Sequence, residues 1–399
     1  MTIGPPQARE QLLRRCGRRV RLGMVGGGAD SVIGETHRVA LRVDGLCELV
    51  AGAMSIVPEI ALETARMNLI PEDRVYTDFR VMAEAEARRD DRIDAVVIAT
   101  PPQVHLEIAQ AFLEQGIDVI CEKPMTATAA QAAKLVSLVE ASARILVLTH
   151  CYTGYPMVRQ ARDMVRAGTI GQMTLIEAEF CAGDPGVARE PADKAKRHWR
   201  FHPESMGKAA ILGEVGSHAH NIASYVTGRN IVSVSARLDT FAANRDVYDN
   251  AYLTTGWDNG AVGRIWSSYV AIGNEHGLSF RIFGEDGALV WRQEEPEVLW
   301  LQRLGQPTCR LSRGLDELSR PSLEATRFRP GHPEGYALAF ANLYRDYAYA
   351  RLSELIGEDR SPHLEHLPDV RAGLAVMQLI EAAERSHNRQ GAVEFVGRE

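Results

Sequence analysis

The sequence lacks the features that direct a protein to nucleic acid, a membrane or disulfide bonds. Its net charge is −7, so no attraction to nucleic acid or anionic lipid is expected. No run of about 20 apolar residues is present, and no signal-peptide pattern follows the basic N-terminal stretch. The six cysteines form no C-x-x-C pair and no zinc-site spacing. We therefore expect reduced thiols, no metal, no nucleic-acid or membrane partner, and a cytoplasmic location.

The length and composition predict two globular domains. The chain has 399 residues, of which 45% are hydrophobic and 24% charged, an ordinary balance for packed cores. The pattern of apolar runs changes at about residue 150. We divide the chain into a lead-in at 1–18, a first domain at 19–150 and a second domain at 151–399.

The first domain alternates short apolar runs with amphipathic segments. The runs predict strands at 21–25, 46–53, 95–99, 118–121 and 145–149. The segments between them predict helices at 37–41, 60–67, 79–88, 106–115 and 129–141. This alternation indicates an α/β fold with a doubly wound parallel sheet, whose ligands bind at the carboxyl ends of the strands.

The second domain reads as α+β, with a large, mainly antiparallel open sheet and one face covered by helices. Longer strand patterns occur at 173–181, 231–241, 250–257, 261–270, 278–283 and 288–293. Asn259-Gly260 and Asp286-Gly287 between such runs are strong hairpin signals. Residues 303–333 are rich in Pro, Gly, Ser and Arg and predict a long surface excursion. Helical patterns follow at 335–352 and 369–385.

A glycine-rich turn follows the first predicted strand. Gly26, Gly27 and Gly28 come directly after an apolar run, and Gly34 precedes a helical pattern. Strand, glycine turn and helix bring backbone N–H groups to a pyrophosphate. The third glycine of the usual G-x-G-x-x-G pattern is delayed from position 31 to Gly34. Ordinary turn chemistry remains the alternative interpretation of these glycines.

Two further motifs follow later strands of the same predicted sheet. Thr100-Pro101-Pro102-Gln103-Val104-His105 follows the third strand, and its prolines predict a rigid loop beside a nucleotide. Glu122-Lys123-Pro124 follows the fourth strand, which places Lys123 in the ligand crevice. The alternatives are a rigid turn at the first motif and a surface lysine at the second.

In the second domain, Glu214 and His218 lie four residues apart. If residues 212–225 form a helix, the carboxylate and the imidazole share one face and suit removal of a proton from a substrate hydroxyl. Trp199 and Arg200 precede them and are candidates for stacking and for binding a phosphate or carboxamide. Tyr152 and Tyr155 are candidates for the mouth of the crevice. Packing is the alternative for each of these side chains.

These motifs occur in an order and at spacings that resemble the Gfo/Idh/MocA oxidoreductase family over roughly residues 19–300. The resemblance implies a Rossmann domain, followed by a domain whose open sheet forms a homodimer or homotetramer interface. It implies a catalytic lysine at Lys123 and a catalytic histidine at His218. Glu214 stands where the family has an aspartate, which lengthens the carboxylate by one methylene.

The activity implied by the resemblance is hydride transfer between NAD or NADP and a hydroxyl or keto carbon. The expected substrate is a polyhydroxylated small molecule: a sugar, a glycoside or an inositol-type polyol. His218 would move the proton, Lys123 would stabilise negative charge on oxygen, and Glu214 would orient either of them. The residues expected at the coenzyme are Gly26, Gly28, Gly34, Ser55, Thr100, Pro101, His105, Glu122, Lys123, Trp199 and Arg200. Those expected at the substrate are Lys123, Tyr152, Tyr155, Glu214 and His218.

The choice between NAD and NADP stays open at this stage. The second strand ends in Ala53-Met54-Ser55-Ile56, without the acidic residue that binds the ribose 2′-OH of NAD. No arginine follows the serine either, and Ile60 stands at the comparable place. A non-catalytic dinucleotide-sensing regulator and a reductase of a non-sugar carbonyl or imine remain alternative functions.

Overall fold

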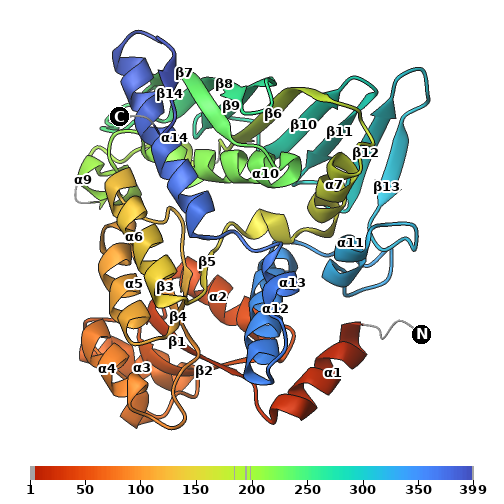
Figure 1. Ribbon diagram of the computed structural model, residues 1–399. Helices are drawn as coiled ribbons and strands as arrows, with labels where there is room; N and C mark the ends of the chain where they lie inside the picture. The colour runs from red at the N-terminus through yellow and green to blue at the C-terminus, as the bar shows by residue number, and fades with distance from the viewer. Residues whose placement is uncertain (1–4, 184, 194–195, 198, 398–399) are drawn as a thin grey trace. The chain divides into compact units, whose positions relative to one another are not determined.

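The structure is a computed structural model that describes residues 5–183, 185–193, 196–197 and 199–397. Its residues form two compact units that interleave along the chain (Figure 1). The first combines the chain up to Thr126, Ala130–Gly154 and Tyr336–Arg371. The second combines Ala127–Ala129, Tyr155–Gly335 and the chain from Ala372. The sequence division at residue 150 lies near the change of unit at Gly154, but the return of residues 336–371 to the first unit was not foreseen.

The first unit contains a five-stranded sheet in the order β2-β1-β3-β4-β5, with every neighbouring pair parallel. Its strands are β1 (Val20–Gly26), β2 (Cys47–Ala53), β3 (Ala95–Ala99), β4 (Asp118–Cys121) and β5 (Leu146–Leu148). The strand order reverses between β1 and β3, which marks the place where ligands bind in open α/β sheets. The predicted doubly wound sheet is confirmed.

Helices alternate with these strands, as the sequence predicted. They are α1 (Pro5–Cys16), α2 (Val32–Arg42), α3 (Pro58–Met67), η1 (Glu72–Arg74), α4 (Phe79–Ala87), η2 (Pro102–Val104), α5 (His105–Glu114), α6 (Ala129–Ser142), η3 (Cys151–Gly154), α12 (Tyr336–Leu355) and α13 (Ser361–Leu364). Ser31 caps α2 by accepting from the Gly34 N–H, and Asp78 caps α4 in the same way. The predicted start of α2 at His37 was therefore one turn too late.

The second unit contains a nine-stranded sheet in the order β13-β12-β11-β10-β6-β9-β8-β7-β14. Its strands are β6 (Met173–Cys181), β7 (Ile231–Asp239), β8 (Asn250–Trp257), β9 (Val262–Ser268), β10 (Leu278–Gly284), β11 (Gly287–Arg292), β12 (Val298–Arg303), β13 (Cys309–Ser312) and β14 (Glu394–Phe395). Only β6 and β9 pair in parallel among these neighbours in the described chain. The predicted mainly antiparallel sheet is confirmed.

Helices of the second unit pack against this sheet: α10 contacts β6, β9 and β10, and α7 contacts β11 and β12. The helices are α7 (Pro156–Arg166), α8 (Pro185–Ala188), η5 (Trp199–Phe201), α9 (Pro203–Met206), η6 (Leu212–Gly216), α10 (Ser217–Thr227), α11 (Arg320–Ala325) and α14 (Val370–Asn388). Alternation of buried and exposed residues along β7 and β8 leaves the other face of those strands more open.

Most of the predicted surface excursion at residues 303–333 is exposed, but the segment also contributes β13 and α11. It carries the buried Arg313, which is 2% exposed. The Arg313 guanidinium pairs with Glu297 at 2.7 Å and with Glu334 at 2.9 Å. A charged side chain can be buried where carboxylates partner it, and composition alone did not indicate this.

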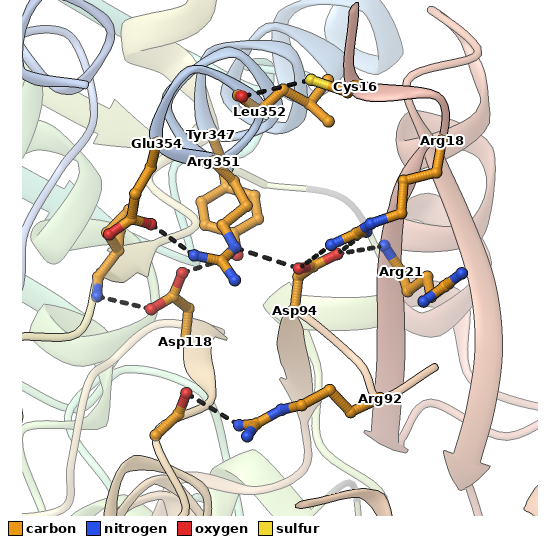
Figure 2. A network of polar contacts seen from close by, with 12 residues as sticks. Cys16, Arg18, Arg21, Arg92, Asp94, Asp118, Tyr347, Arg351, Leu352 and Glu354 are labelled. Carbon is orange, nitrogen blue, oxygen red and sulfur yellow. Dashed lines mark hydrogen bonds and ion pairs between the residues drawn. The ribbon is translucent and has the colours of Figure 1, made fainter. Parts of the chain in front are cut away.

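The helix α12 is tied to the amino ends of β3 and β4 by a polar network (Figure 2). Asp94 precedes β3 and accepts hydrogen bonds from Arg18 at 2.6 and 2.9 Å and from Arg351 of α12 at 3.1 Å. Asp118 begins β4 and accepts from the Tyr347 hydroxyl of α12 at 3.0 Å. This network joins a late segment of the chain to the sheet formed by the first 150 residues.

The two carboxyl groups of the network respond differently to burial. Burial by itself raises the pKa of Asp94, but hydrogen bonds from Arg18 and from the Arg21 N–H outweigh it and leave this pKa below its usual value. Burial raises the pKa of Asp118 above its usual value, in spite of its hydrogen bonds. Asp94 therefore stabilises the fold as a charged group.

The sequence led us to expect no disulfide bond, no membrane-spanning helix and no metal site. All six cysteines are free thiols, four of them buried, while Cys309 is exposed and Cys16 lies between. Within the described ranges, no helix has the length and apolarity needed to span a bilayer. The same part of the chain shows no group of three or more His, Cys, Asp or Glu side chains placed to hold a metal ion.

We predict that Asp94→Asn lowers the free energy of unfolding at neutral pH by roughly 2–4 kcal/mol, because Arg18 and Arg351 lose a charged partner. The folded pKa of Asp94 lies below its unfolded value of about 3.9, so its contribution is complete above that value and lost as the pH falls further. Urea unfolding at neutral pH and at about pH 2.5, well below the unfolded pKa, measures both effects. Glu84→Gln, on exposed α4 surface, is the control; an equal deficit at both pH values would contradict the prediction.

Candidate functional site

The glycine turn at the end of β1 fits only residues without a side chain. Gly26 and Gly27 have φ values of +74° and +68°, in the left-handed region. A Cβ at Gly26 would lie 2.6 Å from the Ala99 carbonyl oxygen and from Thr100 Cγ2. The turn therefore passes directly against the end of β3.

Gly34 allows α2 to approach this turn. A Cβ at Gly34 would lie 2.5 Å from Gly27 Cα, which no folded backbone tolerates. Close packing of helix against strand is the function of the third glycine in dinucleotide-binding turns. The delayed glycine thus performs the usual function from a longer loop.

Arg38 of α2 holds the glycine turn from inside. Its side chain is 3% exposed, donates to the Gly27 carbonyl and pairs with Glu35 at 2.9 Å. Because a trans peptide points its C=O and N–H in opposite directions, the Gly28 N–H faces away from Arg38. The sequence analysis missed Arg38, since an arginine on a helix usually faces water.

The ends of three adjacent strands carry the remaining predicted residues of this unit. Gly26 pairs with Ala99 and Ile98 pairs with Cys121, so the segments after β1, β3 and β4 meet at one edge. Thr100 and Lys123 belong to these segments. The Thr100 Oγ1 is buried and has no hydrogen-bond partner in the described structure.

His105 connects two of these segments. Its ring is fully buried, with Nε2 2.8 Å from the Thr100 carbonyl oxygen and Nδ1 3.1 Å from the Pro124 carbonyl oxygen. Burial lowers the pKa of His105, although both carbonyls favour a protonated ring. The histidine therefore fixes the loop after β3 to the peptide that follows Lys123.

Glu122 lies in a buried network behind Lys123. Its carboxylate accepts from His37 Nε2 at 3.1 Å, from the Thr149 hydroxyl, and from the Lys123 N–H at 3.1 Å. Burial alone raises the pKa of Glu122, but the hydrogen bond and charge of His37 and the charge of Lys123 outweigh it and lower the pKa. Its predicted contact with coenzyme stays a prediction.

The carboxyl end of β2 is polar but not acidic. Ser55 is partly exposed and its Oγ accepts from the Val57 N–H at 3.1 Å. Pro101 is exposed at the start of the loop after β3. Both stay predicted coenzyme contacts.

In the second unit, the turn that carries Glu214 differs from the expected α-helix. Residues Leu212–Gly216 form a π-helical turn, and α10 begins only at Ser217. A Cβ at Gly216 would lie 3.0 Å from Ser267 Oγ, so the widened turn fits closely against β9. The assumption that Glu214 and His218 stack as on a regular helix is therefore wrong. Such π-turns occur frequently at functional sites.

Glu214 is anchored by groups from other segments. Its Oε2 accepts from the Tyr269 hydroxyl at 3.4 Å and lies 3.6 Å from Arg200 Nη1. Burial, followed by the negative charge of Glu214, raises the pKa of Tyr269 well above its usual value, so this phenol stays a donor. Arg200 was predicted to contact the coenzyme, and in the structure it contacts Glu214. Trp199, which precedes Arg200 in the sequence, is 38% exposed.

His218 is buried to 7% exposure, and its ring lies 5.9 Å from the Phe180 ring. Phe180 also packs on His276 at 4.5 Å. His220 is buried, and desolvation lowers its pKa to about 4, so it is a neutral structural residue near neutral pH. Tyr269 and Phe180 had no sequence signal, because the fold brings them from distant segments to Glu214 and to His218, respectively.

Tyr152 and Tyr155 are both buried. Tyr152 packs against Tyr336 in the first unit, with ring centroids 6.2 Å apart. In the second unit, Tyr155 is 2% exposed, packs on Trp291 and accepts from Gln293 Nε2 at 3.3 Å. These are packing contacts, and contact of either ring with substrate stays a prediction.

Comparison with known proteins defines the class. Residues 20–150 match the oxidoreductase family with an NAD-binding Rossmann fold, and residues 158–290 match the GFO/IDH/MocA C-terminal domain. An uncharacterized oxidoreductase of Bacillus subtilis, YfiI, is 32% identical over 94% of this chain and 96% of its own length. The chain therefore belongs to the Gfo/Idh/MocA oxidoreductase family.

Two further relatives have a named activity or ligand. The crystal structure of an inositol dehydrogenase homologue from Azotobacter vinelandii, complexed with NADH and myo-inositol, is 34% identical. Its TM-score is 0.86, and the match covers 96% of this chain and 98% of that one. Levoglucosan dehydrogenase from Pseudarthrobacter phenanthrenivorans is 25% identical over 80% of this chain and 83% of its own length.

The residues of the first unit fit a dinucleotide. Gly26 and Gly34 form a cradle that any Cβ would fill, and it lies at the start of α2, where backbone N–H groups favour a phosphate. The Thr100 hydroxyl is a buried group still lacking a partner among the described atoms. This geometry and the NAD-binding family of residues 20–150 are compatible with a dinucleotide at the glycine turn, and the contacts of its residues with the coenzyme stay a prediction.

We predict that Gly34→Ala lowers the free energy of unfolding by roughly 1–3 kcal/mol and weakens coenzyme binding, because the new Cβ separates α2 from the turn. Urea unfolding and calorimetric titration with NADH measure the two effects. Gly335→Ala is the matched control, since a Cβ there meets no neighbour within 4 Å. Unchanged NADH affinity in Gly34→Ala would contradict the assignment.

Proposed function

We propose that this protein is an NAD(P)-dependent dehydrogenase that acts on a CH–OH group of a sugar, glycoside or inositol-type polyol. The family, the glycine cradle and the lysine at the end of β4 support the proposal. Two relatives support the substrate class: one structure holds myo-inositol, and another relative is a levoglucosan dehydrogenase. The bound nicotinamide would supply the hydride acceptor or donor.

In the proposal, Lys123 donates a hydrogen bond to the reacting substrate oxygen. Its backbone is fixed on both sides: Glu122 accepts from its N–H at 3.1 Å, and His105 lies 3.1 Å from the carbonyl oxygen of Pro124. A cation held in this way stabilises the negative charge that develops as the hydroxyl proton leaves. This fixed lysine is the observation on which the proposal depends.

His218 takes the hydroxyl proton in oxidation and returns it in reduction. Its buried imidazole has the chemistry for both directions. Glu214 is held by Tyr269 and Arg200, and it positions the polar groups of α10 or binds a second substrate hydroxyl. The longer glutamate is accommodated by the π-helical turn on which it sits.

The expected homodimer or homotetramer through the second-unit sheet stays part of the proposal. Leu175, Tyr252 and Val262 are 46%, 43% and 53% exposed on β6, β8 and β9. Exposed apolar side chains on a sheet face suit contact with a second copy. The solution mass measured by light scattering tests it.

We predict that Lys123→Met lowers kcat at least about a hundredfold, because a catalytic donor is lost, while NADH affinity changes much less. The assay follows coenzyme reduction with a panel of sugars, glycosides and inositols, with NAD and NADP in parallel. Lys134→Met, an exposed lysine of α6, is the control. Turnover of Lys123→Met near that of the unaltered protein would remove Lys123 from the mechanism. Coenzyme binding without turnover in either direction would favour a dinucleotide-sensing protein instead.

A further inference from the structure

The loop between the glycines is longer than usual and carries an exposed acid. Five residues separate Gly28 from Gly34, where the usual pattern has two. Asp30 lies in this segment and is exposed. Among the described residues, no hydrogen bond or ion pair engages its carboxylate. The end of β2, in contrast, has no acidic residue at Met54 or Ser55.

The structure ties this loop to the end of β2. A Cβ at Gly28 would lie 3.1 Å from the Met54 carbonyl oxygen and 3.4 Å from Asp30 Oδ1. The Ala29 N–H donates to Thr64 Oγ1 at 3.2 Å, and Thr64 belongs to α3, the helix that follows β2. The Ser31 N–H closes the turn onto the Gly28 carbonyl at 2.9 Å. The loop backbone is thereby held beside α3, and Asp30 Oδ1 lies on the same side of Gly28 as the Met54 carbonyl oxygen at the carboxyl end of β2.

This position matters because the adenosine ribose of a dinucleotide lies at the end of β2. There an acidic residue binds the ribose 2′-OH of NAD. We propose, resting on the coenzyme site of the proposed function, that Asp30 supplies this carboxylate from the lengthened loop and selects NAD over NADP. The carboxylate that is missing at the end of β2 is supplied by Asp30, from the loop between β1 and α2.

The selection follows from charge and hydrogen bonding. An ionised carboxylate accepts a hydrogen bond from the 2′-OH and cannot donate one to a 2′-phosphate. The additional phosphate of NADP brings up to two negative charges next to Asp30, which repel it at short range. The hydrogen bond from the Ala29 N–H to Thr64 holds the loop backbone in place, so the carboxylate stays near this phosphate.

Calorimetric titration with ADP-ribose and with 2′-phospho-ADP-ribose tests the selection without any turnover. The unaltered protein is expected to bind ADP-ribose more tightly. Asp30→Asn is expected to reduce that preference at least about tenfold, mainly by tightening the 2′-phosphorylated ligand. In the double variant Asp30→Asn, Ser55→Asp, an acid at the end of β2 is expected to restore the preference.

Glu84→Gln removes the same charge from an exposed position of α4 and is expected to leave the preference unchanged. An equal change in affinity for both ligands in Asp30→Asn would overturn the inference, since the carboxylate would then act only on the pyrophosphate. An unchanged preference would overturn it as well. Failure of the unaltered protein to bind either ligand would contradict the coenzyme site itself, a result distinct from binding without selection.

Discussion

The contact of Gly27 with Gly34 is the constraint on which the coenzyme site depends. Because neither residue has a Cβ, α2 approaches the end of β1 more closely than any other pair of residues would allow. This approach places Arg38 on the Gly27 carbonyl and His37 on Glu122, in two consecutive buried positions of one helix. The glycine turn and the strand end that carries Lys123 are therefore held by the same element.

Most of the first unit could be predicted from the sequence, because its signals are local. Each strand of the parallel sheet is an almost continuous apolar run, and each motif residue follows such a run directly. Gly34 was noted in the sequence as a delayed third glycine, and its close packing against Gly27 is seen only in the structure. The segment from Tyr336 could not be assigned in this way. Its place in the first unit depends on Asp94 and Asp118 pairing with side chains more than 200 residues away.

In the second unit, the sequence identified the candidate residues but not the local structure that carries them. Glu214 and His218 were found from their types and spacing, yet the turn that carries them is a π-helix rather than a regular helix. Gly216 of this turn lies close to Ser267 of β9, a contact that local periodicity does not contain. Tyr269, which anchors Glu214, comes from the segment after the same strand. The contact of Tyr269 with Glu214 joins residues 55 positions apart, so local patterns in the sequence do not predict it.

The buried network around Glu122 links the coenzyme turn to the late helix α12. His37 bonds Glu122 with Nε2, while its Nδ1 lies 2.6 Å from the Tyr344 hydroxyl. Burial raises the pKa of Tyr344 well above its usual value, so the phenol keeps its proton. A carboxylate only accepts hydrogen bonds, so the His37 ring carries a proton on Nε2, directed at Glu122. The position of Lys123 therefore depends on a residue of α12 as well as on its own strand, because Tyr344 holds the other nitrogen of the imidazole that bonds Glu122.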